Sequence, residues 1–138
     1  MLTLRNLQKE DVPLLMTYDK KVPLSEWDTL LHSGRVLVAE HNGRFSGWLR
    51  YDFFASRFPM VHWLGTVLPE NREEICERLL SEWETRARIY GYTRVMADVL
   101  AQEWMHDWFC ARGYRDCGTL LLPENETHWF LTKSVGRA

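Results

Sequence analysis

The segment Val67–Leu80, VLPENREEICERLL, joins an apolar strand to an amphipathic helix through a turn at Pro69. The start of a helix is a natural anion site, because its first N–H groups are unpaired and its dipole is positive there. Glycine lets a phosphate approach such a backbone without a Cβ in the way. This segment has no glycine and carries carboxylates at Glu73, Glu74 and Glu77, so an anion site is only one of its possible uses.

The same residues also support a structural interpretation. Asn71 followed by Glu74 is close to a capping box, in which two side chains satisfy the first backbone donors of a helix. Glu73 and Glu74 would also complement the positive end of the helix dipole. We expect a helix that caps itself, with the phosphate site as the open alternative.

His62 and Asp98 are candidates for moving a proton. His62 lies in a strand-like run, and Asp98 lies near the carboxyl end of another. Imidazole and carboxylate groups commonly take a proton from a reacting substrate. The structural alternatives are a histidine satisfied in the core and an aspartate paired with Arg94 or Arg115.

The histidines and cysteines show no familiar metal-ligand spacing. None of the five histidines has a histidine partner three or four residues away, and no H-E-x-x-H pattern occurs. The three cysteines are odd in number and lack C-x-x-C spacing, which argues against a disulfide framework and a zinc site. We predict no metal, and we expect reduced cysteines that are mostly buried.

The composition is that of an ordinary globular protein, with 138 residues, 46% hydrophobic and 26% charged. This length predicts a single domain over 1–138. The net charge is −2 and the basic residues are scattered, so we predict no nucleic-acid partner. The apolar runs are far shorter than the roughly 20 residues of a spanning helix, and no signal pattern follows Met1. We expect no membrane partner and a cytoplasmic location.

The first third of the chain predicts a short strand followed by two helices. The strand covers 2–7, and the apolar spacing over 9–18 is typical of a helix. A second helix is expected to have Ser25 as its N-cap and to end at Gly34.

The middle of the chain carries its clearest local signals. The run 35–54 alternates on both sides of Asn42-Gly43, a dipeptide that favours a tight hairpin turn. The nearly continuous apolar run 60–68 predicts a strand covered on both faces, hence a central one. An amphipathic helix is expected over 72–90.

The last third predicts a strand over 93–100, a helix over 102–112 and a hairpin formed by 115–122 and 128–135. The resulting order is β-α-α-β-β-β-α-β-α-β-β. We therefore predict an α/β fold with a mixed sheet and a strand–helix–strand unit at its centre.

This order, together with three stretches, resembles the GNAT superfamily of acetyl-CoA-dependent N-acetyltransferases. The likeness runs from Leu2 to about Lys133, and the stretches are WLGTVLPENR, ARIYGYTRVMADVL and WFCARGY. In that family the pantetheine arm of the coenzyme bonds the free backbone of the fourth strand. Its diphosphate lies in an R/Q-x-x-G-x-G/A turn at the following helix start.

The diphosphate turn departs from the family pattern. Aligned from Pro69, Arg72 matches, whereas Ile75 and Glu77 occupy the glycine positions; a shift of one residue gives Glu74 and Cys76 instead. We expect the bulk of Ile75 to obstruct the backbone and the carboxylates to repel a polyanion.

A second departure concerns proton donation. The family tyrosine that resembles a general acid falls at Phe109, which has no proton to donate. The family asparagine upstream falls at Gln102, which keeps an amide.

The resemblance implies acetyl transfer from acetyl-CoA to the primary amine of a small molecule or peptide. It places Val67 and Arg72 near the coenzyme and leaves His62 or Asp98 to deprotonate the amine. Because of the departures we expect coenzyme binding to be weakened and activity to be diminished or lost. The alternative is a non-catalytic module of the same fold that binds another ligand or a protein, and the seven tryptophans would suit a homodimer.

Overall fold

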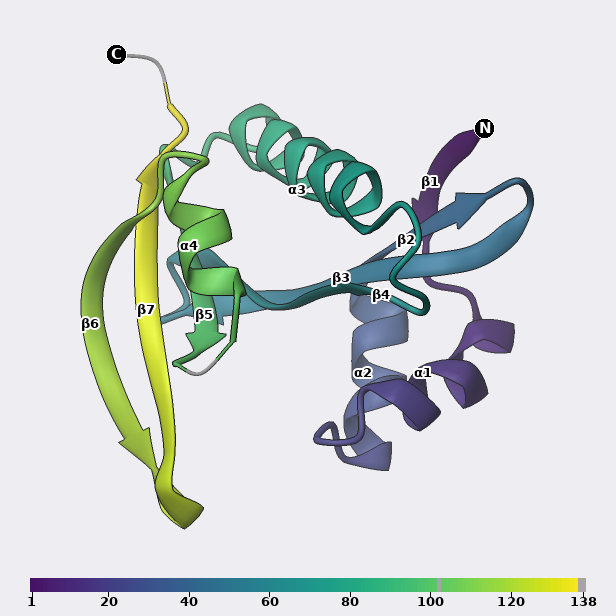
Figure 1. Cartoon of the computed structure of the whole chain (residues 1–138), viewed down its shortest axis with the longest axis horizontal. Coiled ribbons are helices and arrows are strands. Elements are labelled where there is room, and N and C mark those ends of the chain that lie inside the picture. The colour runs from purple at the N-terminus through teal and green to yellow at the C-terminus, as the bar shows by residue number, and fades with distance from the viewer. Residues whose placement is uncertain (102, 137–138) are drawn as a thin grey trace. The chain divides into compact units, whose positions relative to one another are not determined.

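The computed structural model describes residues 1–101 and 103–136. Over these residues the chain forms seven strands, four α-helices and two short 3-10 helices (Figure 1). The elements are β1 (Leu2–Asn6), η1 (Lys9–Asp11), α1 (Val12–Tyr18), α2 (Leu24–Ser33), β2 (Val36–His41), β3 (Arg44–Phe54), β4 (Phe58–Thr66), α3 (Arg72–Ile89), β5 (Arg94–Leu100), α4 (Met105–Cys110), β6 (Arg115–Leu122), η2 (Pro123–Asn125) and β7 (Glu126–Ser134).

The strands form one mixed sheet in the order β1-β2-β3-β4-β5-β7-β6. Strand β4 has three strands on each side, which confirms its predicted central position. It pairs in parallel with β5, whereas β5 with β7 and β6 with β7 are antiparallel. The predicted α/β fold with a mixed sheet is confirmed, as is the predicted order of its strands and α-helices.

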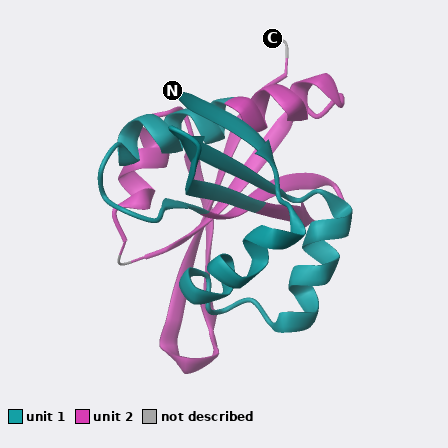
Figure 2. Ribbon diagram, turned by 90° about the vertical axis from the view of Figure 1, so that its right-hand side faces the viewer, with its two compact units in different colours: residues 1–50, 64–81 teal, residues 51–63, 82–138 magenta. Residues whose placement is uncertain are grey.

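The chain divides into two compact units (Figure 2). Unit 1 contains residues 1–50 and 64–81, and unit 2 contains residues 51–63 and 82–138. Strands β3 and β4 and helix α3 contribute residues to both units. The single domain over 1–138 stays a prediction.

In unit 1, the hairpin of β2 and β3 turns where the sequence predicts. Asn42 and Gly43 have φ angles of 55° and 79°, which suit a residue with a short polar side chain followed by a glycine. The two strands bury Val38, Trp48 and Leu49 completely. This hairpin is therefore fixed both by its turn and by its apolar positions.

Helix α2 starts two residues earlier than predicted. Its N-cap is Pro23, with φ −61° and ψ 149°, and no side-chain hydrogen bond caps it. The predicted cap at Ser25 is wrong, because the ring of Pro23 already fixes its φ and the extended ψ turns the chain into the helix. The predicted end at Gly34 is confirmed, with φ 69° at the C-cap.

In unit 2, a buried polar cluster joins α3 to β7. The hydroxyl of Tyr114 donates to Glu84 at 2.7 Å, and Nζ of Lys133 donates to the same carboxylate at 2.9 Å. Burial, and then the charge of Glu84, raises the pKa of Tyr114 well above its ordinary value. This tyrosine is therefore held protonated as part of the core.

The cysteines differ from expectation. Cys76 is buried, but Cys110 and Cys117 are exposed, so the prediction of mostly buried cysteines is wrong. Cys110 is the last residue of the short helix α4, and Cys117 lies on β6, the last strand of the sheet. Neither position is covered by a second layer.

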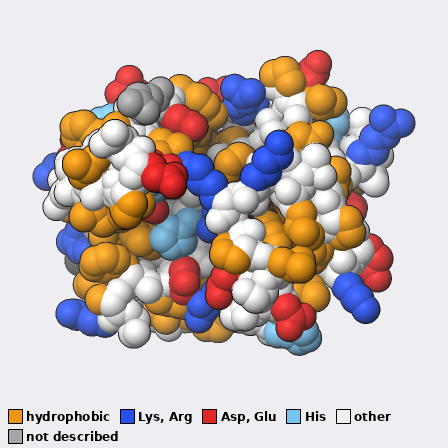
Figure 3. Space-filling view, turned by 90° about the horizontal axis from the view of Figure 1, so that it is seen from below, with side chains coloured by type: hydrophobic (Ala, Val, Ile, Leu, Met, Phe, Trp, Pro, Cys, Tyr) orange, Lys and Arg blue, Asp and Glu red, His pale blue; other side chains and the backbone are white. Residues whose placement is uncertain are grey.

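The surface carries charges of both signs. On the face drawn in Figure 3, basic and acidic side chains are interspersed among apolar ones. Among the described residues, no helix combines the length and the apolar character that a membrane crossing requires.

Candidate active site

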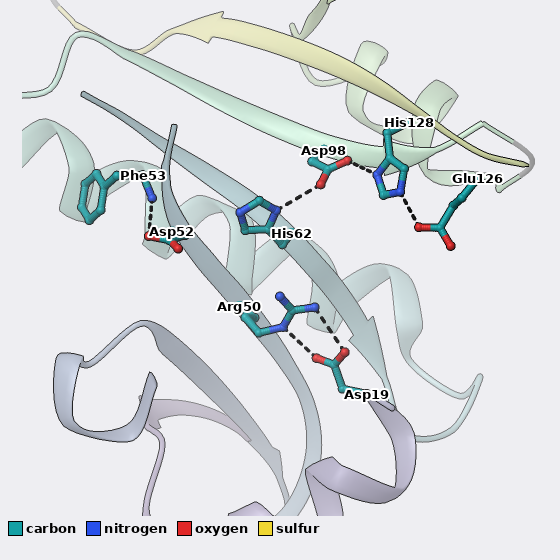
Figure 4. A network of polar contacts seen from close by, with 8 residues as sticks. All are labelled: Asp19, Arg50, Asp52, Phe53, His62, Asp98, Glu126 and His128. Atoms are coloured by element: carbon teal, nitrogen blue, oxygen red, sulfur yellow. Dashed lines mark hydrogen bonds and ion pairs between the residues drawn. The ribbon is translucent and has the colours of Figure 1, made fainter. Parts of the chain in front are cut away.

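Four side chains in unit 2 form a continuous chain of polar contacts (Figure 4). Nδ1 of His62 lies 3.1 Å from Oδ2 of Asp98. The other oxygen of Asp98 contacts Nδ1 of His128. Nε2 of His128 lies 2.6 Å from Oε1 of Glu126. Asp98 is thus placed between two histidines, and His128 between two carboxylates.

The register of β4 and β5 brings the first pair together. The two strands are parallel, with Val61 opposite Ala97. The next residues are His62 and Asp98, whose side chains share one face because neighbours along a strand alternate. The two predicted proton-moving residues therefore meet, and the predicted alternative in which arginine pairs with Asp98 is wrong, because histidines contact both carboxylate oxygens.

The register of β5 and β7 adds the second pair. Leu100 lies opposite His128, and Asp98 lies opposite Phe130. His128 is thus the diagonal neighbour of Asp98 on one face of the sheet. Glu126, two residues before His128, shares that face.

The four side chains are mostly buried, but each keeps some contact with solvent. Their exposed fractions are 25% for His62, 14% for Asp98, 15% for His128 and 30% for Glu126. Among the described residues, Nε2 of His62 has no hydrogen-bond partner. The network therefore ends in a ring nitrogen of His62, a side chain that is one-quarter exposed.

The network sets the charge of its central groups. Burial alone would raise the pKa of Asp98, but the hydrogen bonds from His62 and His128 outweigh burial and hold that pKa below its ordinary value. Burial would likewise lower the pKa of His128, but its bonds to Glu126 and Asp98 raise the pKa above the ordinary value of a histidine. Asp98 is anionic at neutral pH, and the positive form of His128 is favoured.

An anionic Asp98 also decides the tautomer of His62. A carboxylate accepts, so Nδ1–H of a neutral His62 donates to it, and Nε2 carries the free lone pair. An imidazole oriented in this way is suited to take a proton from a substrate. His62 is therefore a candidate general base, with Asp98 as its positioning residue.

The start of α3 in unit 1 is held by close packing. A Cβ on Gly47 would lie 2.7 Å from the carbonyl oxygen of Gly65 and 2.8 Å from Cγ2 of Ile75. Ile75 is only 2% exposed. The expectation that Ile75 obstructs the backbone is wrong, because its side chain packs into the core.

The predicted capping box is not formed. Asn71 has φ 61°, a left-handed conformation, whereas an N-cap is normally extended. Its carbonyl accepts the N–H of Ile75 at 3.0 Å. Within the described part of the chain, no side-chain hydrogen bond joins Asn71 to Glu74, because the left-handed turn gives Asn71 a backbone unlike that of a cap.

The other predicted coenzyme positions lie around this helix start. The N–H of Val67 donates to the carbonyl of Ser46 at 2.8 Å, so it takes part in strand pairing. The side chains around the first turn are exposed, and they are Glu70, Arg72, Glu73, Glu74, Glu77 and Arg78. The exposed side chains of this helix start therefore include four carboxylates and two guanidinium groups.

Phe109 lies in the core of unit 2, with an exposed fraction of 1%. Its ring packs against Trp108 and Tyr114, with ring centroids 5.3 and 4.9 Å away. Helix α4 is shorter than the predicted helix over 102–112. Gln102 lies outside the described residues.

His128 and Glu126 were not singled out by the sequence. The available signal is their i, i+2 spacing, which places both on one face of a strand. Their approach to Asp98 depends on the register of β7 against β5, and the sequence alone does not fix that register.

Comparisons with known proteins identify the fold. No family model and no curated protein match the chain. A solved GNAT-family acetyltransferase from Bacillus cereus superposes with a TM-score of 0.76 at 18% identity, and the match covers 97% of each chain. Ribosomal-protein-alanine N-acetyltransferase from Brucella melitensis gives 0.79 at 20%, covering 96% of this chain and 99% of that one. N-acetylglutamate synthase from Neisseria gonorrhoeae, solved with coenzyme A and N-acetyl-glutamate, gives 0.78 at 21%, covering 99% of this chain and 36% of that one.

The chain has the GNAT fold. In this fold the resemblance described above expects a coenzyme diphosphate at the start of α3, held by glycine amides. The chain offers no glycine between Val67 and Leu80, and its exposed carboxylates outnumber the guanidinium groups there. The N–H of Val67 is already bonded to Ser46. These residues do not fit a diphosphate, although the GNAT fold around them is intact.

Proposed function

We propose that the chain is an N-acyltransferase that moves an acyl group from a thioester to a primary amine, with His62 as general base. The observation that carries the proposal is the contact of Nδ1 of His62 with Asp98, in a histidine whose side chain is 25% exposed and whose Nε2 is not used in that contact. The shared fold with acetyltransferases supports the same class of reaction.

The reaction is a direct aminolysis. Nε2 of His62 takes a proton as the amine nitrogen forms a bond to the thioester carbonyl carbon. The carbon–sulfur bond then breaks, and the thiolate leaves with the bonding electron pair. Return of the proton from His62 to the sulfur completes the exchange, so amine and thioester become amide and thiol.

Asp98 and His128 assist without touching the substrate. Asp98 fixes the ring orientation of His62 and stabilises the imidazolium that forms when His62 takes a proton. His128 and Glu126 in turn hold Asp98 in place. This support is expected to affect the turnover rate more than the affinity for the amine.

The acyl donor that the fold implies is acetyl-CoA, and the acceptor is the amine of a small molecule or peptide. The acidic residues at the start of α3 disfavour the diphosphate of this donor, so we propose weak coenzyme binding and diminished activity. A thioester with a shorter, less charged carrier is expected to react comparatively well.

A second function is favoured by a different observation. Phe109 is buried where the family has a tyrosine, and Tyr114 beside it is held by Glu84. Neither residue offers an acidic proton. A non-catalytic descendant of the fold, binding a protein or another ligand, is therefore the alternative.

Thiol release distinguishes the two functions. The chain would be mixed with acetyl-CoA or N-acetylcysteamine thioester and a panel of amines and N-terminal peptides. His62→Gln is expected to lower the turnover rate by about 10²-fold or more, because general-base catalysis is lost. His32→Gln is the matched control, since His32 is exposed on α2 and accounts for a bond only within its own helix.

Release that depends on His62 and not on His32 supports the acyltransferase. Absence of amine-dependent release with both thioesters at millimolar concentration would favour the non-catalytic alternative. Equal rates in the wild type and His62→Gln would remove His62 from the mechanism.

A further inference from the structure

A second group of reactive side chains lies in unit 2, and it shares no residue with the His62 network. His106 and Cys110 are on α4, and Asp116 is on β6. One ligand atom from each of the three lies within 4.8 Å of the other two. The cluster combines imidazole, thiol and carboxylate, three of the side chains that bind Zn²⁺ in proteins.

One ring nitrogen of His106 is the centre of the cluster. Nε2 of His106 lies 2.6 Å from Oδ1 of Asp116 and 3.9 Å from Sγ of Cys110. In a tetrahedral zinc site, the bond lengths imply ligand-to-ligand distances of about 3.4–3.6 Å. Small movements of exposed side chains would therefore bring all three atoms onto one ion.

The local structure explains why the three groups meet. His106 and Cys110 are four residues apart and so lie on the same side of a helix. Asp116 follows the turn at Gly113, which has φ 95°, and the chain returns alongside α4 at that point. A search of the sequence for two histidines three or four residues apart does not find His106 and Cys110, because the second member of this pair is a cysteine.

The second nitrogen of His106 also has a carboxylate partner. Nδ1 lies 3.4 Å from Oδ1 of Asp107. Histidines that bind zinc commonly donate their other N–H to a carboxylate, which orients the ring and increases its basicity. The ring of His106 also contacts the ring of Trp129, and their centroids lie 5.0 Å apart.

The donor set selects the kind of metal. Mg²⁺ and Ca²⁺ prefer oxygen ligands, whereas a thiolate with imidazole favours Zn²⁺ and its neighbours in the first transition row. Asp116 and Cys110 are exposed, so an ion has access from solvent. Three protein ligands leave a fourth position for water.

We propose that His106, Cys110 and Asp116 form a Zn²⁺-binding site that links helix α4 to strand β6. This site is independent of the proposed acyl transfer. Binding converts the thiol of Cys110 to a thiolate with release of its proton to solvent, and no oxidation is involved.

Cobalt substitution tests the site directly. Co²⁺ would be titrated into the full chain, freed of any affinity tag and reduced with a phosphine. The expected result is one equivalent bound, with a thiolate-to-cobalt charge-transfer band that is abolished when Zn²⁺ displaces the cobalt. Zn²⁺ affinity would be measured by competition with a chromophoric chelator.

Four variants assign the ligands. Cys110→Ser is expected to abolish the charge-transfer band, and His106→Gln and Asp116→Asn to weaken Zn²⁺ binding at least tenfold. Cys117→Ser is the matched control, since it removes the other exposed cysteine and should leave the band unchanged. Far-ultraviolet circular dichroism checks that each variant folds.

A band that survives in Cys110→Ser, or disappears in Cys117→Ser, overturns the proposal. So does a wild type that binds less than one equivalent of Zn²⁺ at micromolar concentration. A second measurement is independent of spectroscopy: Zn²⁺ should raise the melting temperature of the wild type and not that of Cys110→Ser.

Discussion

The polar network at His62 and the helix start at Arg72 handle charge in opposite ways. In the network, each carboxylate faces an imidazole, so charges are paired, and among the described residues Nε2 of His62 has no hydrogen-bond partner. At the start of α3, exposed carboxylates gather at the positive end of a helix dipole and supply the negative charge that a bound anion would otherwise bring. Under the proposed function, proton transfer and anion binding would depend on separate residues, so one could be lost without the other.

The comparison is tested most strongly at Asp98. Asp98→Asn is expected to lower the turnover rate about 10²-fold or more, because a neutral amide does not stabilise the imidazolium of His62. The KM for the amine should change little, since Asp98 does not contact it. Asp28→Asn, an exposed aspartate four residues from His32, is the control. A loss confined to KM would contradict the positioning role.

The stability of the network should depend on pH with a definite sign. His128 has a raised folded pKa, so its stabilisation is complete below the unfolded value near 6.5 and is lost as the pH rises through the folded pKa. Asp98 has a lowered pKa, so its contribution is present above 3.8 and is lost in stronger acid. Both contributions are complete between about pH 4.5 and 6.

His128→Gln is therefore expected to lower the free energy of unfolding by about 2 kcal/mol near pH 5.5, because it removes hydrogen bonds to charged groups. The difference from the wild type should shrink as the pH rises above 7. Urea denaturation at several pH values measures it. A difference that grows with pH would show that His128 is neutral in the folded state.

Removing the carboxylates at the start of α3 tests whether their charge weakens coenzyme binding. Glu73→Gln, Glu74→Gln and Glu77→Gln combined are expected to tighten coenzyme A binding about tenfold at low salt, because three repulsive charges are removed. The gain should shrink as salt is added. Glu26→Gln, which neutralises an acid in the first turn of α2, is the control. Calorimetry measures both, and an unchanged affinity would show that charge is not what excludes the diphosphate.

The smallest effect is expected at Phe109. Phe109→Tyr restores the family residue, but the ring is buried between Trp108 and Tyr114. The new hydroxyl should therefore give no gain in rate, and it should cost about 1–3 kcal/mol of stability if it stays without a partner. Rate and urea midpoint are measured together. A faster variant would show that a proton donor is the missing element.

Much of the fold was predictable because its signals are local. Asn42-Gly43 has the turn chemistry that its hairpin needs, and Gly34 ends α2 as expected. Helix α3 covers Arg72–Ile89 against a predicted 72–90, since an amphipathic repeat spans its whole length. The N-cap of α2 was misplaced because Ser25 has the type of side chain preferred at an N-cap, whereas Pro23 has the extended backbone conformation of one.

The site was only partly predictable, because its contacts are not local. His62 and Asp98 were candidates by residue type, but their contact requires β4 and β5 to pair in parallel at one register. His128 was missed because it joins Asp98 through a different strand. Ile75 was misjudged because a motif gives the residue at a position and not the direction of its side chain.

Gly47 limits which substitutions the chain tolerates at that position. A Cβ at this position would lie 2.7 Å from the backbone oxygen of Gly65, which is too close without a shift, whereas a side chain at Gly118 would enter open space. In a saturation mutagenesis library, codon 47 should tolerate almost no replacement and codon 118 many.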